Sequence, residues 1–325
     1  MSAPPPAPPV DDAALMADAP APVLSAYHLF TDVHGRVPAA RVTPYDIATP
    51  LFTDYAAKTR YFYLPPGKTA RVDGPCLIDF PVGAVLIKSF AFPADLRRPA
   101  ADVRRIETRL LIHRPTGWVA QTYVWNDDQT EAVIKRAGLR VPVAFTDALG
   151  HARSTLYGVP NVNQCKECHS QNGVLAPIGV KARNLDRQVD LWTGRGLITR
   201  VSRIPTGATP RWDDPALPAA DRARAYLDAN CGHCHSRAGL ASNSGLFLTL
   251  EETDPAVQGV GKRPTAAGRA SGDLAFDIAP GRPDESIIVH RMASTDPGVM
   301  MPPIGRTLAH DEGLALVRAY IEGMR

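Results

Sequence analysis

Two copies of one short motif constrain this chain more than any other feature of its sequence. The segments from Cys165 to His169 (CKECH) and from Cys231 to His235 (CGHCH) both read C-x-x-C-H. Chance would supply about 0.002 such motifs in a chain of this composition. We therefore expect the two copies to perform the same kind of chemistry.

The spacing within the motif has a chemical reason. Two thiols three positions apart can reach both vinyl groups of a haem, and the next residue, a histidine, then faces the iron. The pattern predicts two covalently attached haem c groups, each with its iron held by the histidine of the motif. The predicted haem-binding residues are Cys165, Cys168 and His169 for the first haem, and Cys231, Cys234 and His235 for the second.

Three other uses of paired cysteines fit the sequence less well. Zinc ribbons place their two pairs roughly 15 to 20 residues apart, much closer than Cys168 and Cys231. Zinc also needs no histidine directly after each pair. A dithiol redox site would follow a strand in a βαβ unit, and purely structural cysteines would need no histidine. Cys76 lies outside both motifs, and we expect it to be a structural thiol.

The second motif lies between two expected helices. Residues 219–230 have helix-forming composition, with Ala223, Tyr226 and Leu227 on one face. Residues 311–324 again show apolar side chains at helical spacing. Between these helices, Met300 and Met301 precede two prolines. A methionine thioether is a usual sixth ligand of haem iron in electron carriers.

In this order of elements, residues 217–325 resemble a class I cytochrome c domain. The matching features are an entry helix, C-x-x-C-H, a Met-Pro loop and a terminal helix. The resemblance implies His235 as the proximal iron ligand and Met301 as the distal one, because Met301 directly precedes a proline. Met300 is the alternative distal ligand.

The first motif has different surroundings. Residues 157–164 contain proline and glycine, which we expect to exclude a packed entry helix. Downstream, residues 185–198 predict a short helix with Leu185, Val189 and Trp192 on one side. No methionine occurs from Ala17 to Arg291, so the sixth ligand is a histidine, a remote methionine or absent. The candidates are His28, His34, His113, His151, His290, Met16 and Met292.

Upstream of the first motif, short strand-like runs alternate with turn sequences. They predict strands at residues 61–64, 84–92, 106–112, 118–125, 132–135 and 141–145. The expected fold is α+β multidomain, with an antiparallel β-rich domain (sandwich or open barrel), a haem-binding segment and an α-helical cytochrome c-like domain. The expected boundaries are 1–23 for a disordered Pro/Ala-rich tail, 24–160 for the β-rich domain, 161–216 for the first haem-binding segment with its linker, and 217–325 for the cytochrome c-like domain.

Composition limits the partners of this protein. The 36 basic and 33 acidic side chains nearly balance, which argues against nucleic acid as a partner. No apolar run is long enough to span a bilayer. Residues 181–203 are rich in arginine and lysine, suited either to haem propionates and an acidic redox partner or to a solvated helix face.

Several longer segments together resemble a bacterial family of di-haem c-type cytochromes with a β-rich N-terminal region. They are residues 45–55 (YDIATPLFTDY), 80–89 (FPVGAVLIKS), 107–128 (ETRLLIHRPTGWVAQTYVWNDD), 163–169 (NQCKECH) and 291–307 (RMASTDPGVMMPPIGRT). The resemblance implies electron transfer with a redox partner protein in the periplasm or at the cell surface. The given sequence lacks the features of a secretory signal, so any export signal is expected to have been removed or to lie upstream of it. A haem enzyme, peroxidase-like or substrate-oxidising with an open first iron, is the alternative.

Overall fold

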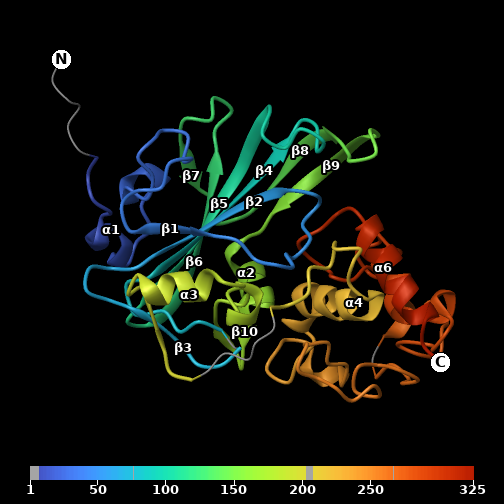
Figure 1. Cartoon of the computed structure of the whole chain (residues 1–325). Helices are drawn as coiled ribbons and strands as arrows, with labels where there is room; N and C mark the ends of the chain where they lie inside the picture. The colour runs from blue at the N-terminus through green and yellow to red at the C-terminus, as the bar shows by residue number, and fades with distance from the viewer. Residues whose placement is uncertain (1–6, 76, 203–207, 266) are drawn as a thin grey trace.

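A large open antiparallel sheet forms the centre of the N-terminal part. The computed structural model describes residues 7–75, 77–202, 208–265 and 267–325, so Cys76 lies outside the described residues. The sheet has six strands in the order β1-β2-β4-β5-β6-β7 (Figure 1). Its strands are β1 (Val42–Tyr45), β2 (Ala57–Tyr63), β4 (Val85–Pro93), β5 (Val103–Arg114), β6 (Gly117–Trp125) and β7 (Ala132–Ile134).

The predicted β-rich region is confirmed, but the expected sandwich or open barrel is not what this sheet forms. Strands β1 and β7 are its two edges, so the sheet remains open. The predicted strand at residues 141–145 belongs to a separate hairpin of β8 (Leu139–Thr146) and β9 (Ala152–Val159). Sequence analysis missed β1 and β9 because neither contains an uninterrupted apolar run.

The N-terminal segment covers one face of the sheet. Helix α1 (Asp12–Met16) and the turn η1 (Leu24–Tyr27) pack there with Leu15, which is fully buried. Tyr63 in β2 donates a hydrogen bond to Asp12 at 2.8 Å. The expectation of a disordered tail over residues 1–23 is therefore wrong from Val10 onward. A few apolar residues among the prolines and alanines are buried against the apolar face of the sheet.

Two clusters cover the opposite face. Helix α3 (Gln188–Gly194) places Trp192 against Phe62 and Phe80, and Leu185 and Val189 join them as predicted. The hairpin of β8 and β9 forms the second cluster with β4. Between these clusters lies helix α2 (Val162–His169), which contacts β6 and leads into the small sheet of β10 (Ser170–Gln171) and β11 (Val174–Leu175).

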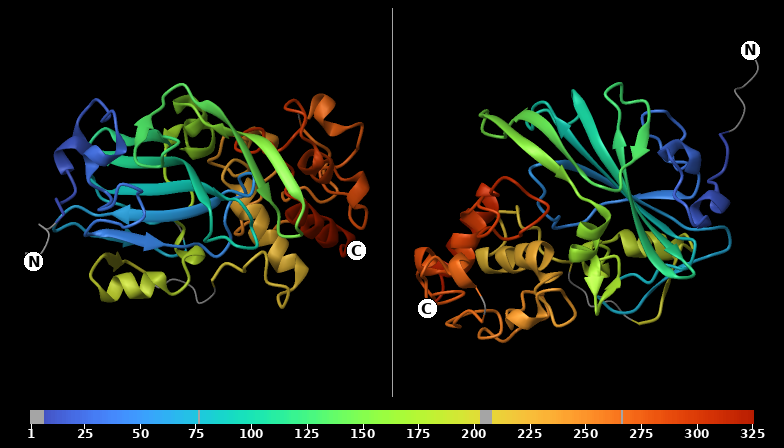
Figure 2. Two further views of the ribbon diagram at one scale, coloured as in Figure 1. Left: turned by 90° about the horizontal axis from the view of Figure 1, so that it is seen from above. Right: turned by 180° about the vertical axis from the view of Figure 1, so that it is seen from behind.

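The C-terminal part lies beside the end of the sheet that is farther from α1 (Figures 1 and 2). It contains α4 (Ala219–Leu227), the π-type turn η3 (Asp228–Gly232), α5 (Ile287–Ala293) and α6 (Asp311–Glu322). Helices α4 and α6 pack together, and Ala223, Tyr226 and Leu227 share one core with α6 as the periodicity predicted.

Short elements complete the chain. Strand β3 (Ala70–Val72) pairs in parallel with β12 (Ile198–Arg200). Single turns of 3-10 helix are η2 (Ala182–Asn184), η4 (Ser242–Ser244), η5 (Gly268–Ser271) and η6 (Pro283–Glu285). Among the described residues, no helix combines the length and the apolar character needed to cross a bilayer.

Candidate functional site

The two C-x-x-C-H motifs lie in different elements but meet in space. The first occupies most of α2, and the second begins in η3. The Sγ of Cys234 lies 3.9 Å from the carbonyl oxygen of Glu167, inside the first motif. Beyond the motifs, Asn172 donates its backbone N–H to the carbonyl oxygen of Ala238 at 2.9 Å. Folding thus joins two cysteine pairs that the sequence separates widely.

The thiols of Cys168 and Cys234 interact directly. Their hydrogen bond, together with burial, raises the pKa of the Cys168 thiol, and the same bond lowers the pKa of Cys234. Burial raises the pKa of Cys165, and it raises that of Cys231 to about 12.

Both motif histidines have the same orientation. His169 places Nδ1 3.0 Å from the carbonyl oxygen of Ala176, and His235 places Nδ1 3.3 Å from that of Leu246. Among the described residues, no hydrogen bond reaches either Nε2. Burial lowers the pKa of both imidazoles to about 4, so both rings are neutral at pH 7. A backbone carbonyl on Nδ1 fixes the tautomer whose Nε2 carries a lone pair, as in many metal-binding histidines.

Local sequence explains why α2 forms despite the proline and glycine before it. Asn161 and Gln164 make a capping box, in which the Asn161 side chain accepts from the Gln164 backbone and the Gln164 side chain accepts from the Asn161 backbone. The helix thus begins only three residues before Cys165. The expectation that no helix leads into the first motif holds for a long packed helix, but the motif itself is helical.

The Met-Pro loop lies close to the second motif. The backbone N–H of Met301 donates to the carbonyl oxygen of Arg291 at 3.0 Å, and Arg306 donates to the carbonyl oxygen of Met301 at 3.1 Å. The charge of Arg306 acts on the Cys231 thiol, and that of Arg291 acts on the His235 ring. Met300 is more deeply buried than Met301, and both remain candidate ligands.

The candidate sixth ligands of the first motif have other contacts. His113 stacks on Trp118 with 4.5 Å between ring centroids, and His34 contacts the carbonyl oxygen of Gln129. His28 contacts the carbonyl oxygen of Pro9, and His151 pairs with an aspartate. The remaining candidates lie in other clusters: Met16 packs on the N-terminal core, Met292 lies in the C-terminal core, and the His290 ring lies next to Gly272.

Sequence analysis missed two residues beside the first motif. His233, between the cysteines of the second motif, hydrogen-bonds the Cys168 thiol and keeps its Nδ1 buried without a partner among the described residues. Lys88 in β4 lowers the pKa of His169 through its charge. The position of His233 inside C-x-x-C-H was visible in the sequence, whereas only the fold brings Lys88 to this place.

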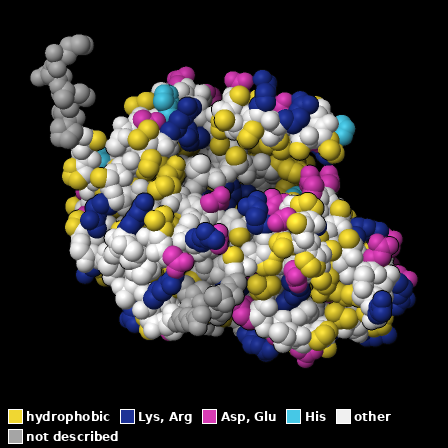
Figure 3. Space-filling model, viewed as in Figure 1, with side chains coloured by type: hydrophobic (Ala, Val, Ile, Leu, Met, Phe, Trp, Pro, Cys, Tyr) yellow, Lys and Arg dark blue, Asp and Glu magenta, His cyan; other side chains and the backbone are white. Residues whose placement is uncertain are grey.

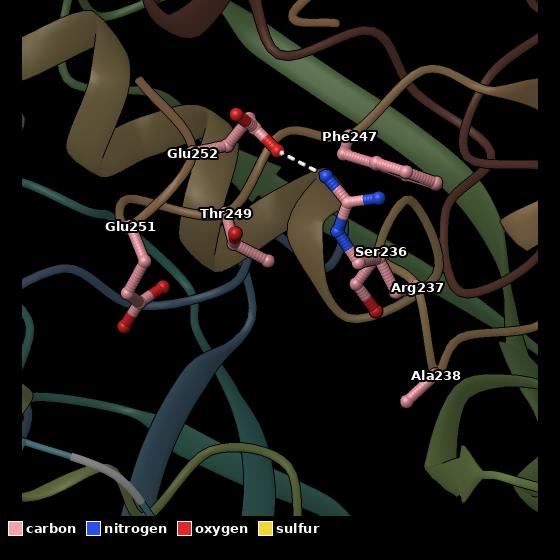
Figure 4. Close-up of a pocket in the computed structure, with 7 residues that line it drawn as sticks. All are labelled: Ser236, Arg237, Ala238, Phe247, Thr249, Glu251 and Glu252. Atoms are coloured by element: carbon pink, nitrogen blue, oxygen red, sulfur yellow. Dashed lines mark hydrogen bonds and ion pairs between the residues drawn. The ribbon is translucent and has the colours of Figure 1, made fainter. Parts of the chain in front are cut away.

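An open depression lies next to the second motif (Figure 4). It is lined by Ser236, Arg237, Ala238, Phe247, Thr249, Glu251 and Glu252. Arg237 pairs with Glu252 at 3.1 Å and lies over the Phe247 ring at 4.8 Å. The arginine of this depression is thus already paired with a glutamate. Neither cysteine of the second motif lines the depression.

Among residues 7–75, 77–202, 208–265 and 267–325, no group of three or more His, Cys, Asp or Glu side chains is arranged as ligands of a single metal ion. Comparison of the chain with protein-family models, curated proteins and solved structures finds no match.

Proposed function

We propose that this protein is a di-haem c-type cytochrome that passes electrons between redox partners in the bacterial envelope. The observation that carries the proposal is the meeting of two C-x-x-C-H motifs with matching histidine geometry. Cys168 contacts Cys234 through its thiol, and each motif histidine keeps Nε2 available.

The donor set suits covalently attached haem. Cys165 and Cys168 in α2, and Cys231 and Cys234 around η3, would each attach one haem by adding their S–H bonds across its two vinyl groups. His169 and His235 would then offer neutral Nε2 atoms to the two irons. The bound haems would supply reversible one-electron oxidation and reduction.

In this proposal the C-terminal part has a cytochrome c-like arrangement around the second haem. Helix α4 leads into the second motif, α6 packs on α4, and the Met-Pro loop lies near Cys231. In this proposal Met301 is the distal ligand of the second haem and sets a fairly high reduction potential. Attachment of haem c takes place outside the bacterial cytoplasm, which places the protein in the periplasm or at the cell surface.

The proposal is tested by producing the chain with an added export signal in a bacterium that matures c-type cytochromes. We expect a haem-stained band on a denaturing gel and an intact mass that includes two haems. Replacing Cys165 and Cys168 by serine should remove one haem, and replacing Cys231 and Cys234 should remove the other. Colourless wild-type protein with the mass of the polypeptide alone would overturn the proposal.

The distal ligand is tested on the same material. Met301→Ala should change the absorbance and the reduction potential of the second haem, while Met300→Ala should leave both unaltered. The reverse result would assign Met300. Carbon monoxide should leave both haems unchanged in an electron carrier, whereas a shift at one haem would favour the haem-enzyme alternative.

A further inference from the structure

A row of basic side chains crosses the sheet on the face that carries α2. Arg60 in β2 lies opposite Lys88 in β4, and Lys88 lies opposite Arg109 in β5. Paired positions point to the same face of a sheet, and neighbouring strands are about 4.8 Å apart, so the row is about 10 Å long. Lys58 lies two residues before Arg60 and joins the same face.

The row faces the first C-x-x-C-H motif. The next paired position after Arg109 is Thr122 in β6, and the Thr122 side chain hydrogen-bonds the Cys165 thiol. Helix α2, which carries this motif, contacts β6. The space-filling view is hollowed between the sheet and the C-terminal part, and both basic and acidic side chains lie around the hollow (Figure 3).

Among the residues that the structure describes, Arg109 is the one member of the row with a fully buried acidic partner. Glu107 is completely buried, accepts from Arg109 Nε at 2.9 Å and accepts from the Tyr157 hydroxyl at 2.6 Å. The Glu107 carboxylate therefore already accepts hydrogen bonds from Arg109 and Tyr157. The remaining cations of the row need other acidic partners.

The positive charges of the other members of the row are poorly compensated by acidic side chains and hydrogen-bond acceptors. Arg60 is buried, its contact with Asp46 is 3.4 Å long, and the Asp46 side chain is 83% exposed. The Nη2 of Arg60 is buried without a hydrogen-bond partner, and Lys88 contacts the Phe90 ring but makes no hydrogen bond or ion pair within the described part of the chain. Lys58 donates only to the carbonyl oxygen of Leu51.

Cations facing one another across strands destabilise a sheet, and burying them without counter-charges costs more. Burial, together with the charges of Arg60 and Arg109, lowers the pKa of Lys58 to about 7. Asp54 opposes this effect, but its oxygens already accept hydrogen bonds from Thr307 and Leu308. An anion bound between these side chains would supply the missing counter-charge and so remove the free-energy cost of burying the cations.

We infer that Arg60, Lys88 and Arg109, with Lys58, form a binding site for a ligand that carries two carboxylates. Arginine and lysine hold carboxylates through charge-assisted hydrogen bonds. The length of the row suits two separated carboxylates better than one compact oxyanion. The two carboxylates are either the propionates of the first haem or the carboxylates of a free dicarboxylic acid. The first source rests on the proposed function, whereas the second does not require haem.

The test uses the full chain as matured by the cell and three variants: Lys88→Met, which removes the charge; Lys88→Arg, which keeps it; and Lys68→Met, an exposed control. Thermal unfolding is followed with succinate and with sulfate at equal ionic strength. The reduction potential of each haem is measured by spectroelectrochemistry.

A free dicarboxylate is the ligand if succinate raises the Tm of the wild type more than sulfate does, with an apparent affinity about tenfold weaker in Lys88→Met. The propionates are the ligand if succinate has no effect, while Lys88→Met lowers the Tm and the potential of one haem and Lys88→Arg restores both. Lys68→Met should behave as wild type. The inference fails if succinate has no specific effect and Lys88→Met leaves the potentials unchanged with an equal or higher Tm. If no haem is attached, the proposed function fails, and the succinate measurement alone decides this inference.

Discussion

At the scale of single residues, Asp228 connects the second motif to the segment that follows the first. Its carboxylate is 5% exposed and accepts from Lys181 at 2.9 Å and from Arg183 at 2.8 Å. Burial alone would raise the pKa of Asp228, but the charges of Lys181 and Arg183 outweigh it and hold the pKa below its ordinary value. These two cations were expected to face a haem propionate, an acidic partner or solvent. In the fold they instead form ion pairs with Asp228 inside the protein.

We predict that Asp228→Asn lowers the free energy of unfolding by about 3 kcal/mol at pH 7, because Lys181 loses its carboxylate partner and Arg183 is left with Glu251, whose side chain is 53% exposed. A carboxyl with a lowered pKa stabilises the fold above its ordinary pKa of about 3.9 and loses that effect as pH falls through the folded value. Urea unfolding should therefore show a smaller difference between wild type and variant at pH 3 than at pH 7. Asp127→Asn, at a carboxylate that is 97% exposed, is the control and should change neither value. An equal or larger difference in acid would contradict this account.

At the scale of elements, the short helix α2 depends on its N-terminal cap. The helix has eight residues, and none of its side chains is more than partly buried, so packing contributes little to its stability. We predict that Asn161→Ala lowers the free energy of unfolding by about 1 kcal/mol. Asn161→Asp should retain stability, because its carboxylate can accept the same backbone hydrogen bond.

Chemical denaturation of purified protein measures this effect, and Asn163→Ala is the matched control because Asn163 is exposed within the same helix. Equal losses for Asn161→Ala and Asn163→Ala would mean that the cap contributes nothing specific.

At the scale of the whole molecule, one loop ties the sheet to the C-terminal part. Asp54 is 1% exposed and accepts hydrogen bonds from the backbone of Thr307 at 2.7 Å and of Leu308 at 2.8 Å. Nearby, Phe52 donates its N–H to the side chain of Asn230 at 2.7 Å, directly before the second motif. These contacts couple the two parts of the chain.

We predict that wild-type protein unfolds in one calorimetric transition and that Asp54→Ala separates it into two, because two partly buried backbone N–H groups lose their acceptor. Asp73→Ala, in an exposed pair with Ser202, is the comparison and should keep the single transition. A single transition in Asp54→Ala, lowered in temperature only, would show that other contacts dominate the coupling.

Much of the local structure could be predicted from sequence because it depends on periodicity and turns. Strands β2, β4, β5, β6, β7 and β8 and helices α3, α4 and α6 follow apolar patterns, and Trp192 and Leu227 are buried as those patterns require. The order along the N-terminal tail could not be predicted, because its few apolar residues become buried only against a sheet formed later in the chain.

The sequence by itself determined the two C-x-x-C-H motifs and the elements beside them, because thiol spacing and helix periodicity are properties of neighbouring residues. The tertiary structure alone decided that Cys168 contacts Cys234, that Asp228 takes Lys181 and Arg183 as partners, and that Arg60, Lys88 and Arg109 form one row. These groups come from strands and helices far apart in the chain, and strand register and packing place them together.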